Sequence, residues 1–278
     1  MLHLSDLTTL DEFRKVEELE GLIWGRVDLV PVVILAVSVR RGAVLVGAWD
    51  DDQLVGFVYS FPALRRGEAG ASHWSHMLGV HPDHRGTGLG RELKLAQRDR
   101  VLALGLDLVE WTYDPLQAAN AHLNFVALGT VVEEYEENVY GESTSPLHGG
   151  IATDRFICQW WIRRPHVERR IRGGVLRAVS HEVVTAPVVN RVKPSGDSLA
   201  PDGVELGRRE PRVMVDIPAD FTTMLAADPA RALEWRLQTR AVFTHYLGAG
   251  YRAVDFTLDK AAGRGRYLLS KVHGSMSP

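Results

Sequence analysis

The feature that most constrains the fold is a strand that runs into a glycine-rich turn and then into a helix. Residues 72–80 have strand composition, and His81-Pro82 ends the strand because proline cannot donate to a strand ladder. The turn is Arg85-Gly86-Thr87-Gly88-Leu89-Gly90, and apolar residues then recur at three- and four-residue steps as far as Leu104. Main-chain N–H groups at such a turn, together with the start of a helix, predict a site for an anion the size of a pyrophosphate.

The glycine spacing separates this turn from other phosphate-binding motifs. A dinucleotide-binding G-x-G-x-x-G counted from Gly86 would need glycine where Arg91 stands, and the chain has no Gly-Lys-Ser or Gly-Lys-Thr of a P-loop. Arg85, Gly88 and Gly90 instead satisfy R-x-x-G-x-G. This pattern, with the preceding Val-x-Pro, resembles the acyl-CoA pyrophosphate loop of the GNAT N-acyltransferase superfamily. A glycine-rich turn with only a structural role is the alternative.

Composition favours a soluble protein of one large or two modest domains. The 278 residues include 32 basic and 35 acidic side chains, a balance that gives no general attraction to nucleic acid or to membranes. The single cysteine, Cys158, excludes an internal disulfide and a cysteine-based zinc site, and no metal is expected. No signal peptide or membrane span is evident, so we expect a cytoplasmic location.

The predicted order of elements agrees with a GNAT fold over residues 1–165. Helices are expected after a cap at Thr8 or Thr9, with Glu12 placed for a capping box from Thr9, and at 32–39. Strands are then expected at 43–49, 54–61 and 72–80, followed by the helix after Gly90, a strand at 106–113 parallel to the previous one, a helix at 117–128, and strands at 130–140 and 156–163. The expected fold class is α/β, an α+β arrangement with a mixed sheet. Stretches at 75–80, 111–116 and 140–142 resemble a group of bacterial GNAT-like proteins of poorly defined substrate.

The chain after residue 165 is expected to form a smaller α+β extension. Residues 166–211 are predicted to be a linker with short strands, an exposed loop at 194–203, and arginines that form either a solvated face or a contact to the ribose phosphate of the coenzyme. Residues 212–278 read as strand–helix–strand–strand, with the helix beginning at Asp228-Pro229 and burying Leu233, Leu237 and Ala241. This region is a degenerate half-repeat of a GNAT fold or an extension that packs on the first domain or forms a homodimer contact.

The resemblance implies an acetyl-CoA or other acyl-CoA co-substrate whose pantetheine arm lies between two diverging strands. A main-chain N–H near Leu78 would polarise the thioester carbonyl. Asn120 either bonds the arm or caps its helix. The residues expected to contact the coenzyme are Leu78, Val80, Arg85, Gly86, Thr87, Gly88, Leu89, Gly90 and Asn120.

Histidine 76 is the predicted general base. It lies four residues before Val80, and strand alternation places it on the same face as Leu78 and Val80. The alternative is a buried structural histidine, and Glu110 is a reserve base acting through water. Many GNAT enzymes carry a tyrosine general acid where this chain has Phe125. Tyr135 is therefore a catalytic candidate, with Tyr113 and Tyr140 as alternatives that the sequence does not separate.

Trp111, Asn124 and Arg155 are expected to bind the acceptor. Arg155 would hold a carboxylate by a bidentate pair, or it forms a surface ion pair. The predicted function is transfer of an acetyl or succinyl group from acyl-CoA to the amine of a small molecule, with amino acids as the first candidates. The alternatives are an acyl-CoA-binding regulatory module that has lost catalysis, suggested by Phe125, and a protein lysine acetyltransferase.

Overall fold

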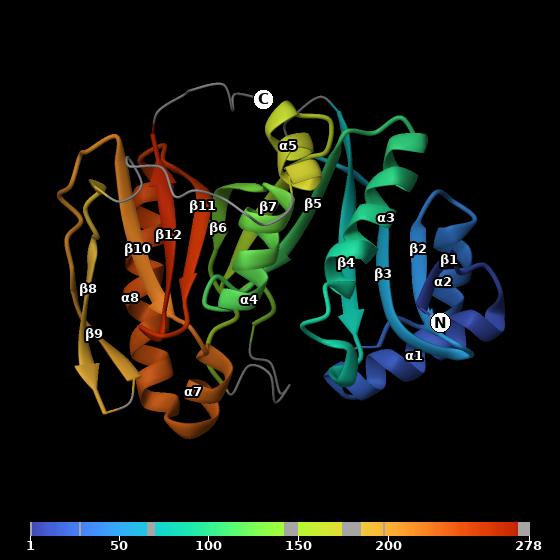
Figure 1. Cartoon of the computed structure of the whole chain (residues 1–278), viewed down its shortest axis with the longest axis horizontal. Helices are drawn as coiled ribbons and strands as arrows, with labels where there is room; N and C mark the ends of the chain where they lie inside the picture. Colours follow the sequence, from blue (N-terminus) through green and yellow to red (C-terminus); the bar gives the residue numbers. More distant parts are fainter. Residues whose placement is uncertain are drawn as a thin grey trace. The chain divides into compact units, whose positions relative to one another are not determined.

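The computed structural model describes residues 2–27, 29–65, 70–141, 150–173, 185–196 and 198–271 (Figure 1). The chain divides into two compact units. The first comprises Met1–Trp111 and Trp161–Arg163, and the second comprises Thr112–Trp160 and Arg164–Pro278. The second half of the GNAT-like stretch thus forms one compact body with the C-terminal extension. The sequence-domain boundaries at residues 165 and 211 stay a prediction.

The first unit contains a mixed sheet. Its strands, in spatial order, are β1 (Leu2–Asp6), β2 (Val44–Asp50), β3 (Gln53–Leu64), β4 (Ala71–Val80) and β5 (Leu108–Tyr113), whose last two residues belong to the second unit. Neighbouring strands are antiparallel except β4 and β5, which are parallel as predicted. Strand β1 was not predicted, because it is short, largely exposed and paired only with β2 in the first unit.

Helices cover both faces of this sheet. One face packs against α1 (Leu10–Trp24) and α2 (Val32–Val39), and the other against α3 (Leu89–Ala103), which crosses β3 and β4 in Figure 1. Two glycines mark the two faces, because a Cβ at Gly79 would meet Ile23 of α1 and one at Gly56 would meet Leu89 and Leu93 of α3. The predicted cap of α1 is confirmed, since Thr9 and Glu12 form a capping box.

The second unit contains an antiparallel sheet. Its strands, in spatial order, are β7 (Arg155–Trp161), β6 (Val131–Glu136), β11 (Arg252–Asp259), β12 (Arg264–Ser270) and β10 (Arg212–Pro218). Helix α8 (Pro229–Gly248) packs on this sheet and begins at the predicted N-cap, Asp228. An aromatic core joins them, with ring centroids 4.5 Å apart for Phe156 and Phe243 and 5.5 Å apart for Phe243 and Tyr267.

Three details of the second unit differ from the predictions. The exposed loop at 194–203 is instead a hairpin of β8 (Asn190–Ser195) and β9 (Ser198–Val204). Helix α8 exposes Leu233 and Leu237, and its buried face includes polar residues with distant partners. The predicted helix at 117–128 starts as α4 (Ala118–Ala121) and continues as a π-helix, η2 (His122–Leu128).

Two further short helices lie in the described part of this unit. Helix α7 (Phe221–Ala227) precedes α8. Helix α5 (Pro165–Gly173) carries Arg169, Arg170 and Arg172, which belong to the segment that was predicted to be a linker. Arg170 of α5 donates from Nη1 to the carbonyl oxygens of Phe125 and Val126, 2.8 and 3.3 Å away, so this arginine satisfies the end of η2. Within the part of the chain that the structure describes, no helix combines the length and apolar character needed to cross a bilayer.

Candidate active site

The glycine-rich turn has the backbone of an open anion site. After the short helix η1 (Pro82–His84), Gly86 adopts φ +78° and Gly88, the N-cap of α3, adopts φ +95°. Only glycine reaches such angles without strain, which explains both positions. A Cβ at either glycine would meet no atom within 4 Å, so the space beside both glycines is open.

The side chains of the turn support it from behind. Arg85 donates from Nε to the carbonyl of Val80 at 3.2 Å, and Thr87 donates from Oγ1 to the carbonyl of His84 at 2.8 Å. Leu89 is buried, whereas residues 85–88 are exposed. Among the described residues, no acceptor takes the main-chain N–H groups of Gly86, Gly88 or Gly90. These groups and the positive end of the α3 dipole are therefore available to an anion.

Strands β4 and β5 stay together for only a short distance. Their recorded pairs are His73 with Val109 and Trp74 with Glu110, whereas β4 continues to Val80. Over residues 75–80, the β5 side of β4 therefore has no partner from β5 among the described residues. The resemblance implies that the two strands diverge at this point, and main chain that lacks a strand partner can bond an extended ligand.

Histidine 76 lies in a β-bulge, which changes its predicted orientation. Opposite β3, Tyr59 pairs with Met77 and Ser60 pairs with Ser75, so His76 is the extra residue of β4. Its ring lies 6.1 Å from the ring of Tyr59 and 5.8 Å from that of Phe61, on the α1–α2 face. The prediction that His76 shares a face with Leu78 and Val80 is wrong.

The placement of Leu78 and Val80 on the other face follows from their partners. Leu78 pairs with Val58, and Val80 pairs with Gly56, whose missing side chain would face α3. His76 keeps an exposed edge, and the protein around it lowers its pKa below the ordinary value of 6.5 by desolvation. The imidazole is therefore neutral at neutral pH and can accept a proton.

Glu110 and Trp111 point to opposite faces of β5. Trp111 is buried under the ammonium of Lys94, whose Nζ lies 3.6 Å from the ring centroid, on the α3 face. Strand alternation then places Glu110 on the face that His76 occupies. Glu110 is buried and lies 3.3 Å from Nε of Arg65. His76 and Glu110, the two candidate bases, therefore lie on the same face of the sheet. Trp111 lies on the opposite face, and its role in acceptor binding stays a prediction.

In the second unit, the three candidate tyrosines have different surroundings. Tyr135 donates its hydroxyl hydrogen bond to Asp154, and burial, followed by that carboxylate, raises its pKa well above the ordinary value. Tyr113 is buried, with its hydroxyl 3.1 Å from that of Tyr267. Tyr140 is exposed, and its hydroxyl lies 3.1 Å from Oγ1 of Thr112. A proton-donating role for Tyr135 stays a prediction that this geometry does not favour.

Arg155 is buried but keeps unused donors. Its Nη1 donates to the main-chain oxygen of Asp154 at 3.2 Å and lies 3.9 Å from the carboxylate of Asp114, and its guanidinium carbon lies 5.2 Å from the ring centroid of Tyr140. Among the described residues, no acceptor is bonded to its Nε or Nη2. Arg155 therefore forms an ion pair with Asp114, as in the alternative, but a buried one, and its binding of a carboxylate stays a prediction.

Known protein families and structures can be compared with this geometry. Residues 15–124 match the model of the acetyltransferase (GNAT) family. That span is the GNAT-like part of the chain, and the match indicates an acyl-CoA-dependent N-acetyltransferase, with acyl-CoA as co-substrate. Among curated proteins none matches the chain.

Solved GNAT structures are similar to part of the chain. The ribosomal-protein-S18-alanine N-acetyltransferase from Escherichia coli is 18% identical, with a TM-score of 0.46 over 58% of this chain and 94% of that chain. NAA60 from Arabidopsis thaliana, in complex with a bisubstrate analogue, is 14% identical, with a TM-score of 0.48 over 58% and 98%. An acetyltransferase of the GNAT family from Streptococcus pneumoniae is 14% identical, with a TM-score of 0.47 over 57% and 98%.

Two asparagines of the second unit were predicted to bind ligands, Asn120 the pantetheine arm and Asn124 the acceptor. Asn120 lies inside α4 and is exposed, and the helix is capped at Gln117, so Asn120 is not the cap. Asn124 in η2 is buried, and its Nδ2 has no hydrogen-bond partner among the described residues. Since buried amides are normally satisfied, Asn124 is a candidate to bond a ligand. Phe125 is fully buried against Tyr267, and a phenylalanine ring has no proton to donate.

Two buried ionisable residues of the first unit were not predicted. Lys94 of α3 donates to Oγ of Ser75 at 2.8 Å and to Oε1 of Gln97 at 3.2 Å. Glu20 of α1 is buried, and its Oε1 has no partner among the described residues. The sequence of α3 does not indicate that Lys94 is buried, because its aromatic partner, Trp111, lies in strand β5. Glu20 follows Leu19 on the buried side of α1, which is the only hint.

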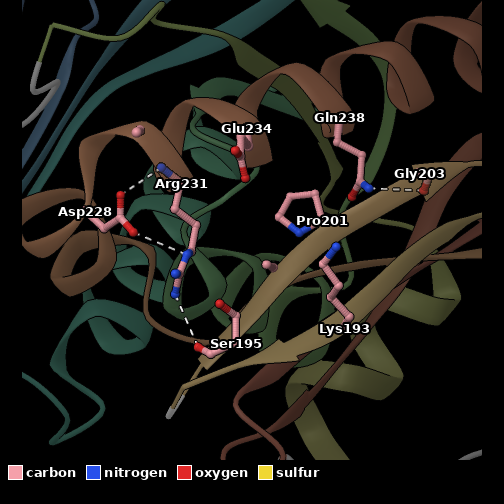
Figure 2. Close-up of a pocket in the computed structure, with 10 residues that line it drawn as sticks. Lys193, Ser195, Pro201, Gly203, Asp228, Arg231, Glu234 and Gln238 are labelled. Atoms are coloured by element: carbon pink, nitrogen blue, oxygen red, sulfur yellow. Dashed lines mark hydrogen bonds and ion pairs between the residues drawn. The ribbon is translucent and has the colours of Figure 1, made fainter.

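Two hollows lie outside these groups. The one in the first unit has a volume of about 730 Å³ and adjoins His81, but Glu18, Asp50, Asp51 and Asp52 line it, and their charge disfavours a phosphate. The one in the second unit, of about 650 Å³, lies between the β8–β9 hairpin and α8 (Figure 2). There Arg231 donates to the main-chain oxygen of Ser195 and pairs with Asp228, and Gln238 donates to Gly203, so these groups mainly hold the hairpin to the helix.

Proposed function

We propose that this GNAT enzyme transfers an acyl group from acyl-CoA to the amine of a small molecule that bears a carboxylate, such as an amino acid. The observation that carries this proposal is Arg155. A buried guanidinium cannot give up its proton, and its planar donor edge fits a carboxylate with two parallel hydrogen bonds. Its stacking on Tyr140 keeps the edge in one orientation.

The donor side of the proposal rests on the first unit. The turn from Arg85 to Gly90 would hold the coenzyme diphosphate through the N–H groups that lack protein acceptors. The pantetheine arm would then run along the main chain of β4 beyond Trp74, and the N–H near Leu78 would donate to the thioester oxygen. Such a donor stabilises the negative charge that develops as the carbonyl carbon becomes tetrahedral.

His76 is proposed to take the proton from the acceptor ammonium before attack. The freed amine forms a C–N bond with the thioester carbon, the C–S bond breaks, and the coenzyme A thiolate leaves with the electron pair. The lowered pKa of His76 keeps its ring neutral and ready for this proton. Glu110, on the same face, is the second candidate.

The leaving thiolate needs little help, because its pKa lies near that of cysteine. Of the three candidate tyrosines, Tyr140 is the one whose hydroxyl is near the surface, so we propose it as the residue that protonates the thiolate. Tyr135 and Tyr113 keep the structural hydrogen bonds described above. Solvent is the alternative proton source.

The test is a thiol-release assay with acetyl-CoA and succinyl-CoA against the amino acids and their methyl esters. We expect at least a tenfold higher kcat/KM for one or more free amino acids than for the matching esters. Arg155→Lys should remove most of this preference, because an ammonium cannot form the bidentate pair. Arg252→Lys is the matched control, since Arg252 lies in the same unit and pairs with Glu133 at 2.8 Å.

Three results would contradict the proposal. Equal turnover of acids and esters would remove the carboxylate requirement. Acyl-CoA binding without thiol release for any amine would identify a regulatory module. Acylation of protein lysines without turnover of small amines would identify a protein acetyltransferase.

A further inference from the structure

The second unit contains a cluster of three arginines and two aspartates that joins the C-terminal extension to the GNAT domain. Arg155 and the two aspartates, Asp114 and Asp154, come from the GNAT-like stretch. Arg236 and Arg240 come from α8 of the extension, where their i, i+4 spacing places them on one side of the helix.

Arg236 and Arg240 each hold one aspartate by two hydrogen bonds. Arg236 donates from Nη1 and Nη2 to the two carboxylate oxygens of Asp114, at 2.9 and 2.5 Å. Arg240 donates from Nε and Nη2 to those of Asp154, at 2.9 and 2.7 Å. Such bidentate pairs fix the orientation of a carboxylate as well as neutralising it.

The remaining acceptor capacity of both aspartates is also used. Asp114 accepts the N–H of Leu116 at 2.9 Å, and Asp154 accepts the N–H of Asn138 at 3.0 Å as well as the Tyr135 hydroxyl. Glu137, which is half exposed, lies 3.3 Å from Nη1 of Arg240 and adds no partner for Arg155. Arg155 therefore has an ion pair with Asp114 at 3.9 Å but no hydrogen bond to a carboxylate among the described residues.

We infer that Arg236 and Arg240 are positioning residues that keep Arg155 free for the carboxylate of the acceptor, so that the extension sets acceptor specificity. This inference rests on the proposed function. Asp114 already forms an ion pair with Arg155 at 3.9 Å, and it would be free to form hydrogen bonds with Arg155 if Arg236 did not hold both of its carboxylate oxygens. The acceptor is then an amine that carries one carboxylate, and this carboxylate forms the hydrogen bonds with Arg155 that Asp114 does not form.

Arg236 is the better target of the two, because it is 1% exposed and holds the aspartate next to Arg155. In Arg236→Gln, the fork is lost and Asp114 can bond Arg155. We expect kcat/KM for the preferred amino acid to fall at least tenfold relative to its methyl ester, with KM for acyl-CoA unchanged. The double variant Arg236→Gln/Asp114→Asn removes the competing carboxylate and should recover most of the acid-over-ester preference.

Arg231→Gln provides the matched control on the same helix. Its side chain pairs with Asp228 and the β8–β9 hairpin (Figure 2), outside the cluster, so it should leave the preference unchanged. A merely structural role for Arg236 predicts instead that the double variant is at least as impaired as the single variant, because two buried interactions are then lost. That result would overturn the inference.

The outcomes separate this inference from the proposed function. If Arg155→Lys abolishes the acid preference and Arg236→Gln retains it, the proposed function stands and the positioning role is wrong. If the wild-type enzyme shows no acid preference, the proposed function itself is wrong. Thermal unfolding of each folded variant, measured in parallel, identifies any that lose activity through loss of structure.

Discussion

Glu20 accepts the main-chain N–H of Val30 at its Oε2 across 2.9 Å, in a site where its side chain is only 1% exposed. This hydrogen bond joins α1 to the segment that precedes α2. Burial raises the pKa of Glu20 to about 7 from an ordinary 4.5, an effect that the Val30 N–H only partly offsets. The first unit therefore contains a carboxyl group that changes charge near neutral pH.

The stability of the protein should depend on pH through Glu20. Between pH 4.5 and 7 the folded state binds this proton more tightly than the unfolded state, so the free energy of unfolding contributed by Glu20 falls as pH rises through this window. The full effect is about 3 kcal/mol. Glu20→Gln should remove this slope. At pH values above 7 it should also raise the urea concentration at which half of the protein is unfolded, as measured by urea denaturation at several pH values. An unchanged slope would show that Glu20 does not titrate there.

Replacement of His76 should lower turnover and alter its pH profile. In the wild-type enzyme, kcat/KM should decline on the acid side with a midpoint below pH 6.5, because the neutral imidazole is the active form. His76→Gln should reduce kcat about 100-fold and remove this acid limb. His245→Gln, an exposed position on α8, serves as the control. Unchanged turnover in His76→Gln would leave Glu110 as the base to examine.

A methyl group at Gly88 should weaken acyl-CoA binding more than it affects folding. At φ +95° alanine is strained by about 1–2 kcal/mol, so the turn would relax and misalign its N–H groups. Gly105→Ala is a close control, since Gly105 has φ +82°, lies beyond the end of α3 and has equally open surroundings. Calorimetry with coenzyme A should show at least a tenfold loss of affinity for Gly88→Ala alone. Equal losses in both variants would argue against the turn as the diphosphate site.

The capping box of α1 gives a stability prediction without a functional effect. Thr9→Ala removes the side-chain oxygen that accepts the N–H of Glu12 and should lower the free energy of unfolding by about 1 kcal/mol. Acyl-CoA affinity should stay unchanged, because this helix end lies outside the glycine-rich turn. A change in affinity in the same variant would link α1 to coenzyme binding.

Features that depend on a few adjacent residues could be predicted from the sequence. The Thr9 cap, the Asp228-Pro229 start of α8 and the turn from Arg85 to Gly90 each have their signal within six residues. The parallel relation of β4 and β5 results from the helix between them, because such crossovers are long and obey a strong rule.

Features that depend on distant partners could not be predicted. The bulge at His76 reverses the face of one side chain, and only the pairing of β4 with β3 reveals it. The buried face of α8 contains Arg236 and Gln238, because their partners are Asp114 and Asn190, far away in the sequence. Periodicity therefore favours Leu233 and Leu237, which are exposed. Arg155 is recognisable by its residue type, but its spare donors depend on two residues of the extension.

The antiparallel contact of β11 with β6, through Ala253 and Val132, has a consequence for shortened versions of this protein. A chain stopped at residue 165 would leave the edge of β6 at Val132 without its strand partner, and Phe156 would lose the ring of Phe243. An uncovered strand edge can pair with other chains, so we expect a fragment of this kind to aggregate more readily than the full chain.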